Sequence, residues 1–174
     1  MYPLDHTLIT PRLRIEPVTA RLAWAARKGG AMFADELGAD APDEWCASGL
    51  ALVARSAQWG SPMPPTRAVA VHLDEGRVIG DVRFEPVFGA RREVEIGYSI
   101  MRSRRRQGYA VEAAGGVIDW LFAEGGAETI IAGCHKRNFG SVRTLRRLGF
   151  WLDATPGDDF WWVLTRELRS SARA

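Results

Sequence analysis

The chain has 174 residues, of which 47% are hydrophobic and 25% are charged, an ordinary globular balance. This length predicts a single domain over residues 1–174 with enough apolar material for a core. The net charge of only +2 argues against a polycation built to bind nucleic acid. No apolar run reaches the roughly 18 residues of a membrane span, and the first residues lack a signal-peptide pattern, so we expect a soluble cytoplasmic protein.

The first half of the chain predicts one strand and two helices. Residues 13–15 alternate between apolar and charged side chains, as in a short strand. Thr19 is a good N-cap for a helix over residues 20–28. A second helix starts at Asp43 and ends before Gly60, where several prolines follow. This order of elements is compatible with several folds.

Strands dominate the middle of the chain. Two β-patterned runs, residues 68–73 and 78–84, are separated by an Asp-Glu-Gly turn and predict a hairpin. A further strand ends at Ile100, and one of its faces carries Glu95 and small residues. The apolar residues that alternate with these are Val94, Ile96, Tyr98 and Ile100.

The second half of the chain predicts two helices and three strands. An apolar stripe at positions 114, 117, 118 and 121 predicts a helix, and we expect its internal glycines, Gly115 and Gly116, to pack against the sheet. A buried strand at 129–132, a helix at 141–147 and strands at 150–152 and 160–165 follow. The strand–helix–strand order predicts an α+β fold with one parallel pair in an otherwise antiparallel sheet.

An arginine-rich turn, residues 102–106, joins the Glu95 strand to the helix that begins after Gly108. The first N–H groups of a helix have no partner within it, and with the helix dipole they favour an anion. Arginines at a helix N-terminus are unfavourable to that dipole, so a negatively charged ligand is the expected reason for them. The turn therefore predicts a phosphate site, although its four arginines are also compatible with nucleic acid.

The segment Arg105-Arg106-Gln107-Gly108-Tyr109-Ala110 fits the pattern (Arg/Gln)-x-x-Gly-x-(Gly/Ala). It resembles the pyrophosphate loop of the GNAT acetyltransferases, in which backbone N–H groups bind acetyl coenzyme A (acetyl-CoA). The segments Glu95-Ile96-Gly97-Tyr98 and Leu148-Gly149-Phe150 look like the branch of ribosomal-protein N-terminal acetyltransferases. The resemblance covers residues 8–168, which we take as the core of the domain.

This resemblance implies a mostly antiparallel twisted sheet of about six to seven strands with one splayed parallel pair, flanked by about four helices. It implies an N-acetyltransferase that moves an acetyl group from acetyl-CoA to a primary amine, without a metal. The amine belongs either to a protein N-terminus or to a small molecule. The residues implied to bind acetyl-CoA are Ile100, Met101, Arg102, Arg105, Arg106, Gln107, Gly108, Tyr109, Ala110, Asn138 and Ser141.

Asn138 and Ser141 have two interpretations. By resemblance, Asn138 contacts the pantetheine arm and Ser141 donates a proton to the leaving thiolate. No tyrosine follows Ser141 in the chain to take that role instead. By local chemistry alone, Asn138 is an N-cap and Ser141 bonds backbone in the first turn of the next helix.

Glu95 is the first candidate for the general base, because it shares a strand face with Gly97, whose small size leaves room for an acceptor. The alternative is that Glu95 pairs with an arginine such as Arg83 or Arg92. Direct attack in a ternary complex needs no covalent intermediate, so we do not expect Cys134 to be a nucleophile.

The acceptor stays open, and we do not carry over ribosomal proteins as the substrate. Five tryptophans either line an aromatic acceptor pocket or belong to the core or a dimer face, and the core or a dimer face is preferred for most. They are Trp24, Trp45, Trp59, Trp161 and Trp162. The alternative functions are a CoA-binding domain with another acyl donor or no turnover, and an arginine-rich nucleic-acid-binding protein. A monomer or a homodimer is expected, with no membrane partner.

Overall fold

The computed structural model describes residues 4–55, 66–90 and 92–171. Within these ranges, six α-helices and one 3₁₀ turn flank a single eight-stranded sheet. The strands are β1 (Leu8–Ile9), β2 (Leu13–Pro17), β3 (Arg67–His72), β4 (Arg77–Pro86), β5 (Glu93–Ile100), β6 (Thr129–His135), β7 (Trp151–Ala154) and β8 (Asp159–Thr165). The helices are α1 (Ala20–Lys28), α2 (Gly30–Leu37), α3 (Asp43–Arg55), α4 (Tyr109–Ala123), α5 (Phe139–Arg147) and α6 (Arg166–Ser171), and the 3₁₀ turn is η1 (Arg102–Arg104).

The strand order in the sheet is β1-β2-β3-β4-β5-β6-β8-β7. Neighbouring strands are antiparallel except β5 and β6, which pair in parallel from Glu93 with Thr129 to Glu95 with Ile131. Helix α4 supplies the crossover that a parallel pair requires. The predicted α+β fold with one parallel pair is confirmed, with eight strands in the described residues where about six to seven were expected.

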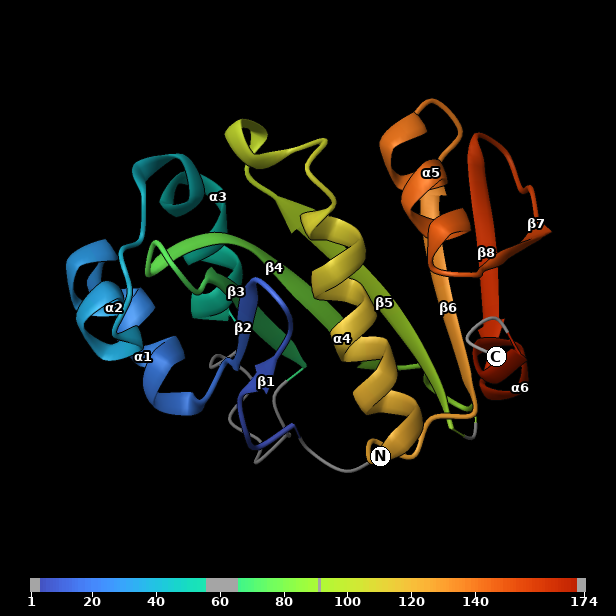
Figure 1. Cartoon of the computed structure of the whole chain (residues 1–174), viewed down its shortest axis with the longest axis horizontal. Helices are drawn as coiled ribbons and strands as arrows, with labels where there is room; N and C mark the ends of the chain where they lie inside the picture. The colour runs from blue at the N-terminus through green and yellow to red at the C-terminus, as the bar shows by residue number, and fades with distance from the viewer. Residues whose placement is uncertain (1–3, 56–65, 91, 172–174) are drawn as a thin grey trace.

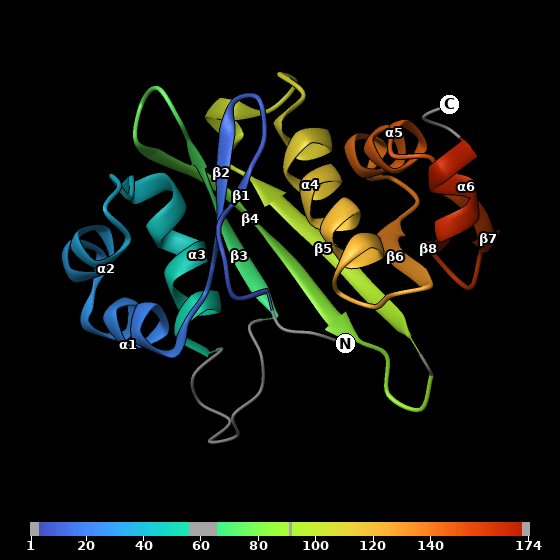
Figure 2. The same ribbon diagram turned by 60° about the horizontal axis from the view of Figure 1, so that its bottom comes forward.

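The sheet carries a core on each face, and β3 shows why. Its residues alternate, so Ala68 and Ala70 pack beneath α4, whereas Val69 and Val71 pack beneath α1–α3. We call these the α4 face and the α3 face. Figures 1 and 2 show α4 on the face opposite to α1–α3, with α5 and α6 beside it at the β6–β8 end.

Three short elements were not predicted from the sequence: β1, α2 and α6. Helix α2 follows α1 with only Gly29 between them, and Gly29 adopts a φ of 123°, which allows the sharp change of direction. Strand β1 has two residues and exists because Leu8 pairs with Ile15 of β2. The predicted end of the second helix before Gly60 and the prolines at 62–65 lie outside the described residues.

The two glycines inside α4 do not face the sheet, so that expectation is wrong. A Cβ on Gly115 would lie 3.6 Å from side-chain atoms of Leu148 and Arg169, and a Cβ on Gly116 would lie 3.0 Å from the methyl group of Thr10. The glycines therefore let the start of the chain and its C-terminal helix pack closely against the outer side of α4.

Candidate active site

The parallel pair β5–β6 separates after Glu95 and Ile131, the last residues in register. A cavity of about 190 Å³ lies where the two strands diverge. It is lined by both strands and by the start of α5. The lining residues are Ile96, Gly97, Tyr98, Ala132, Gly133, Cys134, Asn138, Ser141 and Leu145. The structure thus brings Ser141 and Asn138 to the strand that carries Glu95.

Tyr98 connects β5 to α5 across this cavity. Its hydroxyl lies 3.4 Å from the backbone carbonyl oxygen of Ser141. Burial raises the pKa of Tyr98 to about 12, so its hydroxyl keeps its proton at neutral pH. The sequence analysis placed Tyr98 on the apolar strand face but did not include it in the site. Tyr98 alternates with Ile96 and Ile100 along β5, and this alternation predicts that its side chain lies on the same face of the sheet as theirs.

Asn138 caps α5, and this interpretation is confirmed. Its side-chain oxygen accepts a hydrogen bond from the N–H of Ser141 at 3.2 Å. Ser141 borders the cavity beside Tyr98, and hydrogen bonding with Ser141 partly offsets the burial that raises the pKa of Tyr98. Capping therefore fixes the position of Ser141 at the cavity.

The arginine-rich turn forms η1 and then delivers the chain to α4 through Gly108, which has a φ of 86°. Arg106 also adopts a positive φ, 62°, which is strained for a residue with a Cβ by about 1–2 kcal/mol. The N–H groups of residues 107–110 find no acceptor in the part of the chain that the structure describes. They are the orphan donors of a helix start and suit an anion.

The arginines of this turn differ in their contacts. Both terminal nitrogens of Arg104 bond the carboxylate of Glu75, and the Nε of Arg105 donates to the carbonyl oxygen of Ile100 at 3.0 Å. The side chains of Arg102 and Arg106 are exposed and make no hydrogen bond or ion pair with the described residues. Arg104 and Arg105 therefore stabilise the turn, whereas the side chains of Arg102 and Arg106 remain free to bind an anion.

Ile100 and Met101 precede the turn, and their side chains are buried in the two different cores. The N–H of Met101 donates to the carbonyl oxygen of Ile79 at 2.9 Å. The structure gives these two residues the role of a rigid base for the turn, and their predicted contact with acetyl-CoA stays a prediction.

A network that the sequence analysis missed lies beneath the turn. The carboxylate of Glu112 accepts hydrogen bonds from the Thr10 hydroxyl at 2.8 Å and from the N–H and Nε of Arg12, each at 2.7 Å. Burial opposes the charge on Glu112, but these hydrogen bonds together hold its pKa below the usual value. Arg12 also donates to the carbonyl oxygen of Gln107 and lies 4.3 Å from the centroid of the Tyr109 ring. Glu112 and its partners Thr10 and Arg12 are about a hundred positions apart in the sequence, so no local sequence pattern predicts these contacts.

Glu95 is paired with Arg83, one of the two arginines that the sequence analysis named as an alternative partner. The NH2 of Arg83 donates to Glu95 at 2.7 Å, and its NH1 donates to Glu85 at 2.8 Å. Both carboxylates are partly exposed on the α3 face. Each carboxylate has one oxygen without a bond to Arg83, so Glu95 keeps one acceptor atom.

Cys134 borders the cavity, and burial raises the pKa of its thiol. A thiol held in its protonated form is a poor nucleophile. Across the described residues, His, Cys, Asp and Glu side chains form no group of three or more that suits a metal ion. None of the described helices is both long and apolar enough to cross a membrane.

Of the four candidate tryptophans that the structure describes, two are core residues and two are not. Trp45 and Trp162 are 3% and 2% exposed, whereas Trp24 is half-exposed on α1. Trp161 is intermediate and lies on the α3 face of β8. Trp59 lies outside the described residues.

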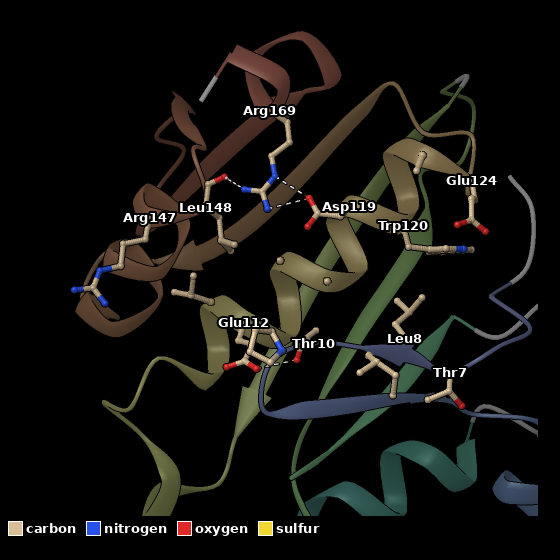
Figure 3. Close-up of a pocket in the computed structure, with 16 residues that line it drawn as sticks. Thr7, Leu8, Thr10, Glu112, Asp119, Trp120, Glu124, Arg147, Leu148 and Arg169 are labelled. Atoms are coloured by element: carbon tan, nitrogen blue, oxygen red, sulfur yellow. Dashed lines mark hydrogen bonds and ion pairs between the residues drawn. The ribbon is translucent and has the colours of Figure 1, made fainter. Parts of the chain in front are cut away.

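A larger open groove of about 640 Å³ runs along the outer side of α4, between β1 and the ends of α5 and α6 (Figure 3). One wall is fixed by Arg169, which donates to Asp119 at 3.1 Å and to the carbonyl oxygen of Leu148 at 2.9 Å. None of the residues predicted to bind acetyl-CoA is among those that line it. The groove is the seam where the N- and C-terminal elements meet α4, and the predicted site lies elsewhere.

The comparisons with known proteins agree with this geometry. A family model described as an acetyltransferase (GNAT) domain matches residues 12–151. The chain belongs to the GNAT acetyltransferase family. A similar GNAT protein is the uncharacterized N-acetyltransferase YjdG of Bacillus subtilis (strain 168), which is 30% identical over 165 residues, or 90% of this chain and 96% of YjdG. The expected acetyltransferase is thus confirmed at the level of the family.

Solved structures share this GNAT fold at low sequence identity. A putative ribosomal-protein-serine acetyltransferase from Vibrio cholerae superimposes with a TM-score of 0.67 at 17% identity, covering 94% of this chain and 99% of that one. RimJ from Mycobacterium smegmatis, in complex with CoA-disulfide, gives 0.64 at 21% identity, covering 96% and 91%. The branch of ribosomal-protein acetyltransferases is therefore represented among the structural neighbours of this GNAT chain.

Proposed function

We propose that this protein transfers an acetyl group from acetyl-CoA to a primary amine by direct attack within a ternary complex. The observation that carries the proposal is the position of the cavity. It opens where β5 and β6 diverge, and the free N–H groups at the start of α4 follow the end of the same strand, β5. A thioester in the cavity and a pyrophosphate at α4 are thus compatible with one extended ligand.

The donor binds through backbone rather than through arginine side chains. The N–H groups of residues 107–110 hold the pyrophosphate, and the free cations Arg102 and Arg106 add charge around it. Arg105 acts through the carbonyl oxygen of Ile100 and so fixes the turn. Ser141 and Asn138 border the pantetheine and thioester end of the ligand.

The reaction forms one bond and breaks one bond. The amine nitrogen attacks the thioester carbonyl carbon, the C–S bond breaks, and the departing sulfur takes a proton from the hydroxyl of Ser141 or Tyr98, which then regains a proton from solvent. The proton lost by the attacking ammonium passes to Glu95, directly or through water. An α-amine, which titrates near pH 8, gives up this proton more readily than a lysine ε-amine.

Two measurements test the proposal. Thermal-shift experiments with acetyl-CoA, CoA and a nucleic acid duplex separate a CoA-dependent enzyme from an arginine-rich nucleic-acid binder, and we expect stabilisation by the first two only. Free-thiol release with acetyl-CoA and a panel of amines and peptides then measures transfer. The absence of both stabilisation and thiol release would refute the proposed function.

A further inference from the structure

Two glycines on opposite sides of the diverging strands line the cavity, Gly97 on β5 and Gly133 on β6. Each is covered on the α3 face by one large side chain. A Cβ on Gly97 would lie 3.3 Å from the Nε of Arg83, and a Cβ on Gly133 would lie 3.3–3.5 Å from the six-membered ring of Trp161. Arg83 and Trp161 therefore flank the cavity where it meets the α3 face, and we call this opening the acceptor mouth.

The strand register places both side chains on one face. Val69 lies in the core of the α3 face and pairs with Asp81, so Arg83 two residues later and its partner Gly97 share that face. Along β6, Gly133 pairs with Trp161. Since Glu95 lies beside Ile131, the next residues of that face on the two strands are Gly97 and Gly133.

The two sides of the acceptor mouth differ in chemistry. On the β5 side, one guanidinium from Arg83 is shared by the carboxylates of Glu85 and Glu95, which leaves a net charge of −1. On the β8 side, Trp161 offers an indole face, and strand alternation places Val163 and the exposed Asp159 on the same face. Val163 pairs with Trp151, which is 42% exposed.

We propose that Trp161 determines acceptor specificity by packing against an apolar or aromatic group that lies within a few carbon atoms of the reactive amine. The proposal rests on the proposed function, because it assumes that the amine reaches a thioester in this cavity. The carboxylate side of the mouth receives the ammonium, and the indole side receives the apolar group. An acceptor with a carboxylate next to its amine is disfavoured, because that group meets Glu95 and Glu85.

A second copy of this chain is a poorer occupant for the mouth itself. The Trp161 ring covers a glycine that lines the reaction cavity, so any group on the ring is adjacent to the acyl donor. The net negative charge beside it complements an ammonium, which is the species that an amine acceptor presents at neutral pH.

Three acceptors that differ by one group each test the assignment. Ethylamine lacks the ring of 2-phenylethylamine, and phenylalanine adds a carboxylate to it. We expect kcat/KM for 2-phenylethylamine to exceed that for the other two by about tenfold, the size of one aromatic contact. Trp161→Ala abolishes the advantage over ethylamine. The matched control Leu152→Ala, an exposed apolar residue on β7 that pairs with Trp162 on the other face of the sheet, retains it.

A binding measurement keeps this test independent of turnover. In calorimetric titrations of CoA-saturated protein, we expect 2-phenylethylamine to bind more tightly than ethylamine and phenylalanine. Trp161→Ala removes this difference in affinity. Equal affinities in the unaltered protein, or an order that survives Trp161→Ala, overturn the assignment. Preferential binding without thiol release for any amine contradicts the proposed function instead and leaves Trp161 as the binding determinant. If Trp161→Ala dissociates a dimer in sedimentation experiments and leaves the amine preference intact, the face serves self-association and the assignment is wrong.

Discussion

Glu44 at the start of α3 accepts two hydrogen bonds from Ser103 in η1, one from its N–H at 3.0 Å and one from its hydroxyl at 2.5 Å. The bonds from Ser103 are the main reason that the pKa of Glu44 lies below its usual value. They join a helix of the α3 face to the turn that leads into α4. The shape of the proposed donor site therefore depends on a residue from the other side of the sheet.

Removing the hydrogen bonds between Glu44 and Ser103 loosens the turn without changing a residue proposed to contact acetyl-CoA. We expect Glu44→Ala to weaken acetyl-CoA binding about three- to fivefold, because the turn must then be ordered at the expense of binding energy. Calorimetry measures the change. Glu36→Ala, which breaks an exposed ion pair with Arg21 between α1 and α2, is the control and leaves the affinity unchanged. Equal losses in the two variants would show that the link to Ser103 has no special role.

We expect Gly108 to matter more to donor binding than any single arginine of the turn. Its φ of 86° is strained for a residue with a Cβ, and a bulky side chain there also obstructs the N–H groups of the α4 start. We expect Gly108→Val to lower acetyl-CoA affinity at least tenfold, and Arg104→Ala, Arg105→Ala or Arg106→Ala to lower it by less. The reverse order in a titration series would mean that side-chain charge, and not the backbone, holds the pyrophosphate.

The Glu112 network predicts a pH dependence of stability. The pKa of Glu112 is lowered from 4.5, so its carboxylate stabilises the fold above that pH and loses the contribution as the pH falls through the lowered value. We expect Glu112→Gln to reduce the free energy of unfolding by about 1–3 kcal/mol at neutral pH. Denaturant titrations from pH 7 to pH 3 check this, and the two proteins converge at the acid end. A difference that does not shrink in acid would assign the loss to packing.

Glu95 is tested as a base by its isosteric amide. Glu95→Gln cannot accept a proton, so we expect kcat to fall by about a hundredfold and the pH profile of kcat to move. Glu93→Gln, on the same strand face but two residues further from the cavity, serves as the matched control. If the profile of Glu95→Gln keeps its shape, the residue only positions Arg83, and water takes the proton.

Cys134 lies at the cavity but is not required for chemistry in a direct transfer. We expect Cys134→Ser to retain kcat within about threefold, because a buried thiol with a raised pKa supplies little thiolate. Intact-protein mass spectrometry during turnover provides the second measurement. An acetylated Cys134 that forms and decays at the rate of turnover would replace the ternary-complex mechanism with a covalent one.

Sequence reasoning was effective where the controlling interactions are local. The alternation along Glu93–Ile100, the cap at Asn138 and the glycine before α4 each depend on a few neighbouring residues, and each is present in the structure. It failed where distant segments decide the outcome. Gly115 and Gly116 face Leu148, Arg169 and Thr10 rather than the sheet, and nothing within α4 itself distinguishes these partners.

The chain's own pattern thus determined the α+β class, the turn before α4, the alternation of the Glu95 strand and the cap at Asn138. These follow from backbone geometry and side-chain periodicity, which act over a few residues. Tertiary structure alone decided which arginines are free, that Glu95 shares Arg83 with Glu85, and that Tyr98 lines the cavity while Trp161 lies against its lining residue Gly133 on the opposite face. The physical reason is that electrostatic pairing and shape depend on residues that meet only when β5 and β6 pair and then diverge.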